Sequence, residues 1–287
     1  FEVTNPTTAA ANGGTFIQRA VVPRVSHEGI AFDNSNSMYF VDELNGGSVY
    51  KYVSANPNAT DGNSFFGAGQ TFALKVGAGG QFEGTNTLPS TFTGAATWEA
   101  ITDTNGGAIA GVSTLLGDGT IDGRVTADHA SILATAFNRP EDMEIQTLAN
   151  GKTFLYFTTT DADNDGDQTN GKGRVYALDL GTSELKLFAD YNTKDIGTGT
   201  SALGSFRSPD NLAFDSEGNM YIVEDQDGGV EDIWFTKDAD MDGVAEYMAK
   251  WVSLTTQGAE STGLFFDIND PNKAYVNVQH PADGIDR

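Results

Sequence analysis

The sequence contains no cysteine and few basic residues, and both shortages narrow the range of functions. Without a thiol among its 287 residues, the chain can form no disulfide, no thiolate metal site and no cysteine nucleophile. Only 16 lysines and arginines stand against 40 aspartates and glutamates, which argues against nucleic acid or an anionic membrane as partner. No apolar run approaches the roughly 18 residues of a membrane span. The formal charge of −24 instead suits divalent cations, a saline medium, or both.

Helical periodicity and the common catalytic signatures are also nearly absent. Short runs rich in Val, Ile, Phe, Tyr and Thr recur instead, bounded by Gly, Asn and Asp, which predicts many short antiparallel strands. The chain has no G-x-S-x-G elbow, no P-loop and no dinucleotide fingerprint, so a serine hydrolase or a dinucleotide enzyme would lack its signature here. The hydrophobic content of 39% is adequate for a globular fold.

Four segments share one plan, and that plan predicts an all-β fold, a β-propeller of four-stranded antiparallel blades. Each opens with a polar or acidic cluster, runs into a short apolar strand, turns, and continues into a second strand ending in polar residues. In a propeller blade, the opening cluster and the end of the second strand meet at one rim of the central channel. At roughly 40–50 residues a blade, we expect about five blades in one domain over 1–287, with a decorated blade or insertion at 54–137. The four segments begin at Ser26, Asn138, Ser208 and Glu260.

Acidic residues gather at the rim positions of this repeat. Around one narrow channel mouth, so many carboxylates could not all stay ionised without cations among them. Hard oxygen ligands favour calcium, magnesium, manganese or ferric iron over zinc or copper. Taken singly, each acid has the alternative of a solvated surface turn. The rim acids are Glu28, Asp42, Glu43, Glu141, Asp161, Asp210, Glu224, Asp225 and Glu260.

Two further aspartate-rich loops match the first half of an EF-hand calcium loop. Alternate carboxylates can wrap one hard cation there, and the following glycine permits the sharp turn. Neither loop has the closing glutamate at its twelfth position, where Lys172 and Ala249 stand. The alternatives are a solvated turn, or a calcium site completed by Asp167 or Glu246. The candidate ligands are Asp161, Asp163 and Asp165 in the first loop and Asp238, Asp240 and Asp242 in the second.

Arg139 and Arg207 stand out because the chain has only seven arginines. Each precedes a proline and an acid, in "RPE" and "RSPD". A guanidinium aimed into a metal-lined channel can bind a phosphate or carboxylate with two parallel hydrogen bonds. The alternative is a structural ion pair with the neighbouring acid. His27 and His280 fall at equivalent rim positions, as metal ligands or as structural histidines.

At these residues the chain resembles the PhoX-type alkaline phosphatases. The matching stretches, in order, are "SHEGIAF", "VYKYV", "NRPEDMEI", "SPDNLAFDSEGNMYIVED", "ESTGLFFD" and "VNVQHP", between positions 26 and 281. The resemblance implies a six-bladed propeller in an exported protein, periplasmic or extracellular. It also implies a cluster of Ca²⁺ and Fe³⁺ at the channel mouth that hydrolyses phosphate monoesters.

The same resemblance implies roles for particular residues. Glu28 and Glu141 correspond to metal ligands, and Arg139 to the arginine that grips the phosphate. Asp210 and Glu260 match acidic positions of the site, and Asn211 is a further ligand candidate. The family's iron-binding cysteine lies on a segment upstream of "HEG", whereas only 26 residues precede His27 here. We therefore expect the chain to begin part-way into the family pattern.

Three functions are compatible with these residues. The first is a metal-dependent phosphoesterase, with Arg139 stabilising charge on the phosphate. The second is a non-catalytic, calcium-stabilised extracellular propeller serving as a structural, adhesive or assembly module. The third is an esterase or lactonase on a calcium propeller, which shares the "PDNLAFDSEGNMY" type of blade. Metal content would separate these, because only the phosphatase calls for iron with calcium.

Overall fold

The structure, a computed structural model, describes residues 1–4, 14–83, 92–160, 173–225, 230–256 and 258–279. These residues confirm the expected all-β fold, with antiparallel strands and two short helices, α2 (Gly62–Phe65) and α3 (Gly123–Ala127). Within these ranges no helix is both long and apolar enough to cross a membrane.

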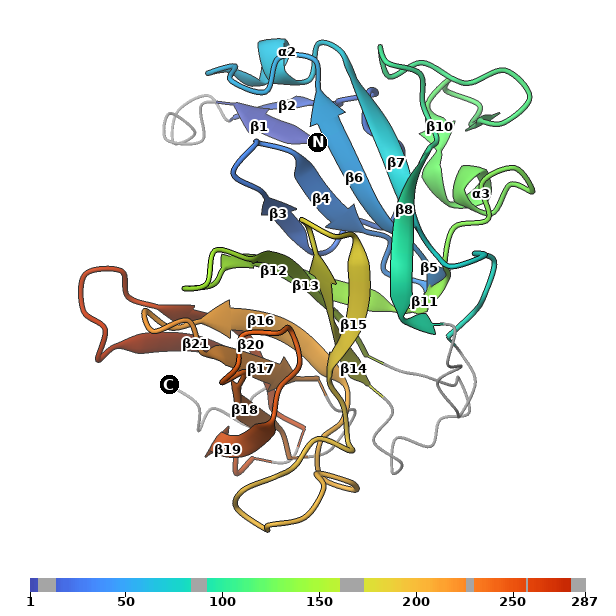
Figure 1. The fold of residues 1–287 in the computed structure, drawn as a ribbon. Coiled ribbons are helices and arrows are strands. Elements are labelled where there is room, and N and C mark those ends of the chain that lie inside the picture. The colour runs from blue at the N-terminus through green and yellow to red at the C-terminus, as the bar shows by residue number, and fades with distance from the viewer. Residues whose placement is uncertain (5–13, 84–91, 161–172, 226–229, 257, 280–287) are drawn as a thin grey trace.

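Three antiparallel blades follow one another along the chain (Figure 1). The first two are joined through one shared strand into a nine-stranded sheet, and the third is a separate four-stranded sheet. The first blade contains β3 (Ile30–Phe32), β4 (Met38–Val41), β6 (Val49–Ser54) and β7 (Gly69–Val76), extended by β8 (Gly94–Ala100). The second contains β12 (Pro140–Thr147), β13 (Thr153–Thr159), β14 (Arg174–Asp179) and β15 (Glu184–Ala189). The third contains β16 (Pro209–Phe214), β17 (Met220–Glu224), β18 (Asp232–Lys237) and β19 (Tyr247–Ser253).

The remaining strands form two-stranded pairs. A fourth unit begins with β20 (Glu260–Phe266) and β21 (Ala274–Gln279). The smaller pairs are β1 (Glu2–Thr4) with β2 (Thr15–Ile17), β5 (Asn45–Gly47) with β11 (Phe137–Asn138), and β9 (Thr114–Leu115) with β10 (Ile121–Asp122).

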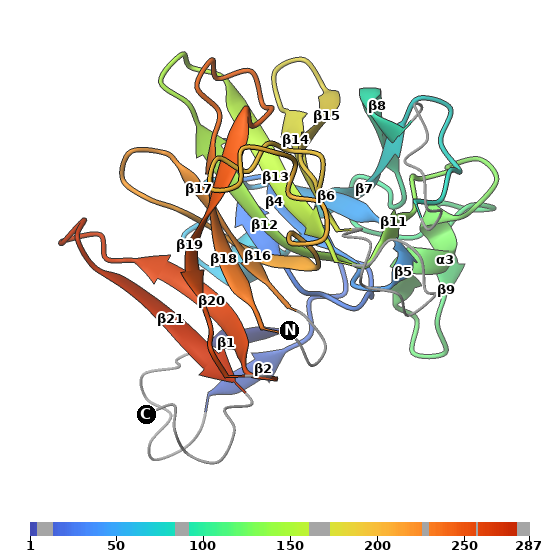
Figure 2. The same ribbon diagram turned by 90° about the horizontal axis from the view of Figure 1, so that it is seen from below.

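The first strand of each blade is the inner one. Strand β3 contacts β12, β12 contacts β16, and β16 contacts β20, so the four inner strands lie side by side in chain order (Figure 1). Figure 2 shows β12, β16 and β20 in this order, seen from below. The start of each inner strand therefore reaches the same end of the central channel, as the repeat predicted.

The turns between the first and second strands follow from local side-chain chemistry. In the third blade, Asp215 Oδ1 accepts hydrogen bonds from the backbone N–H groups of Glu217 and Asn219, both at 2.9 Å. Gly218, between these two residues, has a φ of +79°, a conformation that glycine adopts without steric cost. Asp33 Oδ1 in the first blade repeats the arrangement. The aspartate at the strand end thus sets the hairpin.

The hydrophobic core lies between successive blades. Between the first and second blades, Tyr39 and Leu74 belong to the same buried cluster as Phe157 and Tyr176. A second cluster joins the second and third blades, with Trp234 as its largest buried side chain. Because each blade buries its faces against its neighbours, the packing fixes the order of the inner strands and hence of the rim residues.

The stretch 54–137, for which the sequence predicted a decorated blade or an insertion, contributes strands to the first blade. It supplies β7 and β8 to the first blade, and β8 also pairs with β15 of the second at Leu185. Over its described parts, 54–83 and 92–137, the stretch forms no four-stranded sheet of its own. The outer strands of a blade carry no rim residues, which is why the repeat pattern did not reveal them.

A buried ion pair that the sequence did not indicate ties this stretch to the second blade. Glu83, with no exposed surface, accepts hydrogen bonds from Arg174 Nη1 at 2.8 Å and from the Tyr176 hydroxyl at 2.7 Å. It also accepts from the backbone N–H of Asn138 at 3.0 Å. Glu83 therefore anchors the residue that precedes Arg139, the candidate phosphate-binding arginine.

Candidate functional site

The rim of each blade presents two side chains, one at or just before the start of the inner strand and one at the end of the second strand. In three successive blades, the backbone N–H at the end of the second strand donates to a backbone carbonyl at the start of the inner strand, at 2.8 to 3.2 Å. The carbonyl always belongs to the residue two positions before the rim acid. This shared register makes the positions structurally equivalent. The rim pairs are Glu28 with Glu43, Glu141 with Thr160, and Asp210 with Asp225.

In the second and third blades, a β-bulge near the start of the inner strand contains the rim acid and the residue after it. The register of β12 against β13 shifts between Pro140 and Met143, and that of β16 against β17 shifts between Pro209 and Leu212. Bulges re-aim side chains at sites of this kind. Here the residue after each rim acid binds the next blade, since Asp142 Oδ2 accepts the Leu212 N–H at 2.9 Å.

Asn211 makes the equivalent contact to the fourth unit. Its Oδ1 accepts hydrogen bonds from the Thr262 hydroxyl and the Gly263 N–H, both at 2.8 Å. These two bonds occupy the only side-chain oxygen that could bind a cation. The geometry thus gives Asn211 a place in the contact between blades, and its ligand role stays a prediction.

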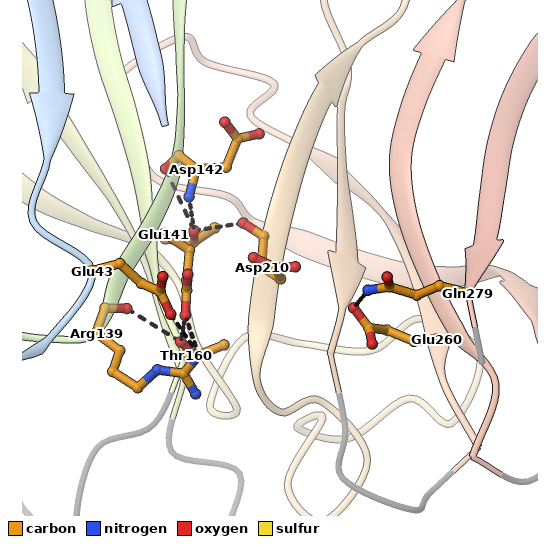
Figure 3. A network of polar contacts seen from close by, with 9 residues as sticks. Glu43, Arg139, Glu141, Asp142, Thr160, Asp210, Glu260 and Gln279 are labelled. Carbon is orange, nitrogen blue, oxygen red and sulfur yellow. Dashed lines mark hydrogen bonds and ion pairs between the residues drawn. The ribbon is translucent and has the colours of Figure 1, made fainter. Parts of the chain in front are cut away.

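Glu141 and Arg139 lie together at the rim of the second blade (Figure 3). Glu141 is buried, with 4% of its surface exposed, and its Oε1 lies 2.9 Å from Arg139 Nη2. The Thr160 hydroxyl donates to the same Oε1 at 2.6 Å. Arg139 Nη2 also lies 3.0 Å from Glu43 Oε1. One guanidinium nitrogen therefore bridges carboxylates from two blades.

The backbone of Arg139 is held in an uncommon conformation. Its φ is +49°, in the left-handed region that non-glycine residues occupy at some steric cost. Its N–H donates to the Leu44 carbonyl at 3.1 Å, and its carbonyl accepts from the Thr160 N–H at 3.2 Å. These bonds fix the main chain, so the rigid blade edge positions the guanidinium.

A second group of acids lies across the rim on the third and fourth units. Carboxylate oxygens of Asp210, Asp225 and Glu260 all lie within 4.8 Å of one another. Burial, and then the negative charges of Glu141, Glu28 and Asp225, raises the pKa of Asp210 to about 9. Glu260 also accepts a hydrogen bond from Gln279 Nε2. Every charged neighbour that shifts the pKa of Asp210 is itself an acid, so a cation bound here would relieve the repulsion between these carboxylates.

Two acids of the first two blades also have raised pKa values. Burial raises the pKa of Glu141 to about 7, although Thr160 and Arg139 oppose the shift. Partial desolvation, together with the charges of Asp142 and Glu43, also raises the pKa of Glu28. Clustered carboxylates that resist ionisation by themselves are the donor set of a hard cation such as calcium or ferric iron. The residues present therefore fit a metal centre.

Two rim acids have partners of their own. Asp42 is fully buried, and the Arg124 guanidinium binds both of its oxygens, at 2.6 and 2.7 Å. Glu224 is fully buried as well, and Trp234 Nε1 donates to it at 2.8 Å. The expectation that these two acids join the metal-facing cluster is corrected, because Asp42 is bound by Arg124 of α3 and Glu224 by Trp234 inside the third blade.

The aspartate-rich loops lie elsewhere or outside the described residues. Asp161, Asp163, Asp165 and the rim histidine His280 belong to the segments that the structure does not describe. The loop of Asp238, Asp240 and Asp242 joins β18 to β19 at the end opposite the rim, where Asn150 Nδ2 of the β12–β13 turn donates to the Met241 carbonyl. Asp238 and Asp240 gather there with Glu246 within 4.8 Å, whereas the Asp242 carbonyl accepts from Lys186 Nζ at 2.6 Å.

Comparisons with known proteins bear on the family and the fold. A family model described as alkaline phosphatase PhoX matches residues 6–282. PhoX of Pseudomonas fluorescens, solved in complex with vanadate as a transition state analogue, is similar with a TM-score of 0.63 and 21% identity. The alignment covers 94% of this chain and 51% of that one, so this chain spans about half the length of the solved PhoX.

The other matches are weaker. A gluconolactonase of Xanthomonas campestris gives a TM-score of 0.35 at 16% identity, covering 92% of this chain and 74% of the other. Comparison with curated proteins finds no match. The similarity to the solved PhoX shows that the fold is a β-propeller. Because the family model matches nearly the whole sequence, this protein belongs to the PhoX alkaline phosphatase family.

Proposed function

We propose that this protein hydrolyses phosphate monoesters at the rim, where acids from successive blades hold a cluster of hard cations. Membership of the PhoX family supports the reaction class. The observation that carries the proposal is the convergence of Glu28, Glu141 and Asp210 from equivalent positions of three blades, with Arg139 bound to one of them. In this proposal Asp225 and Glu260 complete the ligand set.

Arg139 is the residue proposed to bind the phosphate. Of its guanidinium nitrogens, only Nη2 makes an ion pair or hydrogen bond with a described residue, namely with Glu43 and Glu141. Its remaining N–H groups can donate to phosphate oxygens, and the fixed backbone holds them in place as negative charge develops. When bound, calcium or ferric ions would act as Lewis acids that polarise the phosphate. The buried Glu141 lies between the arginine and the other acids, so phosphate and cations would meet beside it.

A calcium-stabilised propeller without catalysis is the second candidate. The observation that favours it is the group of Asp238, Asp240 and Glu246, which lies at the end opposite the rim and could bind a structural calcium. Both functions would use calcium, but only the first requires the rim. We further propose export to the periplasm or beyond and six blades in the complete propeller, as the family resemblance implies.

Hydrolysis of a chromogenic phosphate monoester by the metal-loaded, full-length native protein tests the proposal. We expect turnover to fall by at least about 10²-fold after chelation and to return when calcium and iron are restored, because the metal supplies most of the charge stabilisation at the phosphate. A metal-loaded protein that leaves the ester intact would remove the enzymatic proposal and favour the calcium-stabilised module.

A further inference from the structure

Thr160 interrupts the series of acids at the rim. Its equivalents at the ends of the second strands are Glu43 in the first blade and Asp225 in the third. The second blade thus carries a neutral hydroxyl where both neighbouring blades carry a carboxylate. This is also the blade that contributes Arg139 and the most buried of the inner-strand rim acids, Glu141.

The Thr160 hydroxyl is directed at one oxygen of Glu141. Thr160 is 2% exposed, and its Oγ1 lies 2.6 Å from Glu141 Oε1 and 3.2 Å from the Arg139 carbonyl. A hydroxyl has one proton to donate, and the shorter contact with the charged acceptor receives it. Arg139 Nη2 approaches the same Oε1 at 2.9 Å. Two donors therefore converge on Oε1.

The other oxygen of Glu141 is left for a different partner. Within the described part of the chain, no donor reaches Oε2. A carboxylate that is bound firmly at one oxygen keeps its plane fixed and presents the second oxygen in one direction. Holding Oε1 in place depends on Thr160, because the other donor, Arg139 Nη2, is shared with Glu43.

We infer that Thr160 is a positioning residue, which fixes Glu141 through Oε1 so that Oε2 faces the proposed cation cluster. The inference rests on the proposed function only in taking the rim as a cation site. An acid at position 160, as in the neighbouring blades, would place two carboxylates within hydrogen-bond reach and compete for Arg139. A threonine supplies a donor in the same space.

Calcium titration of the full-length native protein by calorimetry tests this inference. Thr160→Val keeps the shape and removes the donor, and we expect it to weaken calcium binding at the rim by at least about 10-fold, since hydrogen bonds to charged groups are the stronger ones. Thr160→Ser keeps the hydroxyl and should restore the wild-type Kd. Thr236→Val is the matched control, because Thr236 is equally buried but its hydroxyl donates to the Met220 carbonyl, away from the rim.

The outcomes separate positioning from a merely structural role. If Thr160→Val and Thr236→Val lower Tm alike and leave the calcium Kd within twofold of wild type, Thr160 only stabilises the fold and the inference falls. A wild-type protein that binds no calcium overturns it too. Calcium binding that weakens in Thr160→Val, in a protein inert toward phosphate esters, supports the positioning role while removing the proposed hydrolysis.

Discussion

Replacing Arg139 with lysine is expected to lower turnover of a phosphate monoester by about 10²-fold, the typical effect of removing one hydrogen-bond donor that stabilises developing charge. Lysine keeps the positive charge beside Glu43 and Glu141 but loses the planar fork that binds two oxygens at once. The backbone cost of the +49° φ is the same for both residues. Metal content and Tm should therefore stay close to those of the wild type. The measurement is steady-state hydrolysis with elemental analysis in parallel.

Arg24→Lys is the control for this prediction. Arg24 forms an exposed ion pair with Asp118 at 3.1 Å and none with a described rim acid, and pairs of that kind contribute little to stability. We expect this variant to keep wild-type turnover. An Arg139→Lys variant that is equally active would mean that Arg139 serves only as an ion pair at the blade edge.

In the cation-free protein, the free energy of unfolding is expected to fall as the pH rises from 5 to 9. Burial raises the pKa of Glu141 to about 7, of Glu224 to about 8 and of Asp210 to about 9. The folded state therefore holds protons that the unfolded chain releases near pH 4 to 5. Stability that is present at low pH is lost as each group ionises in the folded protein. Since one pKa unit corresponds to about 1.4 kcal/mol, a loss of at least about 3 kcal/mol is expected.

Urea unfolding followed by tryptophan fluorescence, on protein dialysed free of cations, measures this loss. Calcium should reduce the pH dependence, because it replaces the protons between the carboxylates. Asp210→Asn should flatten the upper part of the curve, since it removes the group with the highest pKa of the three. A free energy of unfolding that stays constant or increases over this pH range would show that the rim acids ionise without penalty.

The repeat in the sequence predicted the part of the site that depends on strand register. Glu28, Glu141 and Asp210 occupy the same place in their segments, and the inner strands bring that place to one rim. The apolar runs and the Asp-x-x-Gly turn of the third blade were enough to predict the hairpins. A local pattern therefore determined both the fold class and the side of the molecule on which these acids lie.

The directions of several rim side chains depend on contacts between distant segments, which the sequence could not show. Asp42 and Glu43 are adjacent in sequence, yet Asp42 turns inward to Arg124, 82 residues away, while Glu43 faces Arg139. Asn211 has a side-chain oxygen that could bind a cation, but the bulge turns this oxygen toward the backbone N–H of Gly263. Thr160 carries no charge, so a search for acids missed it. Aligning the ends of the second strands of the four segments would have shown that Thr160 is equivalent to Glu43.

Elemental analysis of the full-length native protein beside its Glu141→Gln variant tests the central claim, that the rim acids hold the cations. Glutamine keeps the shape of Glu141 but removes the charge that attracts a metal ion. The account predicts stoichiometric calcium in the wild type, with or without iron, and the loss of at least one ion per chain in the variant, with the fold retained. A wild-type protein without bound metal, or a variant with the same metal content, would contradict it.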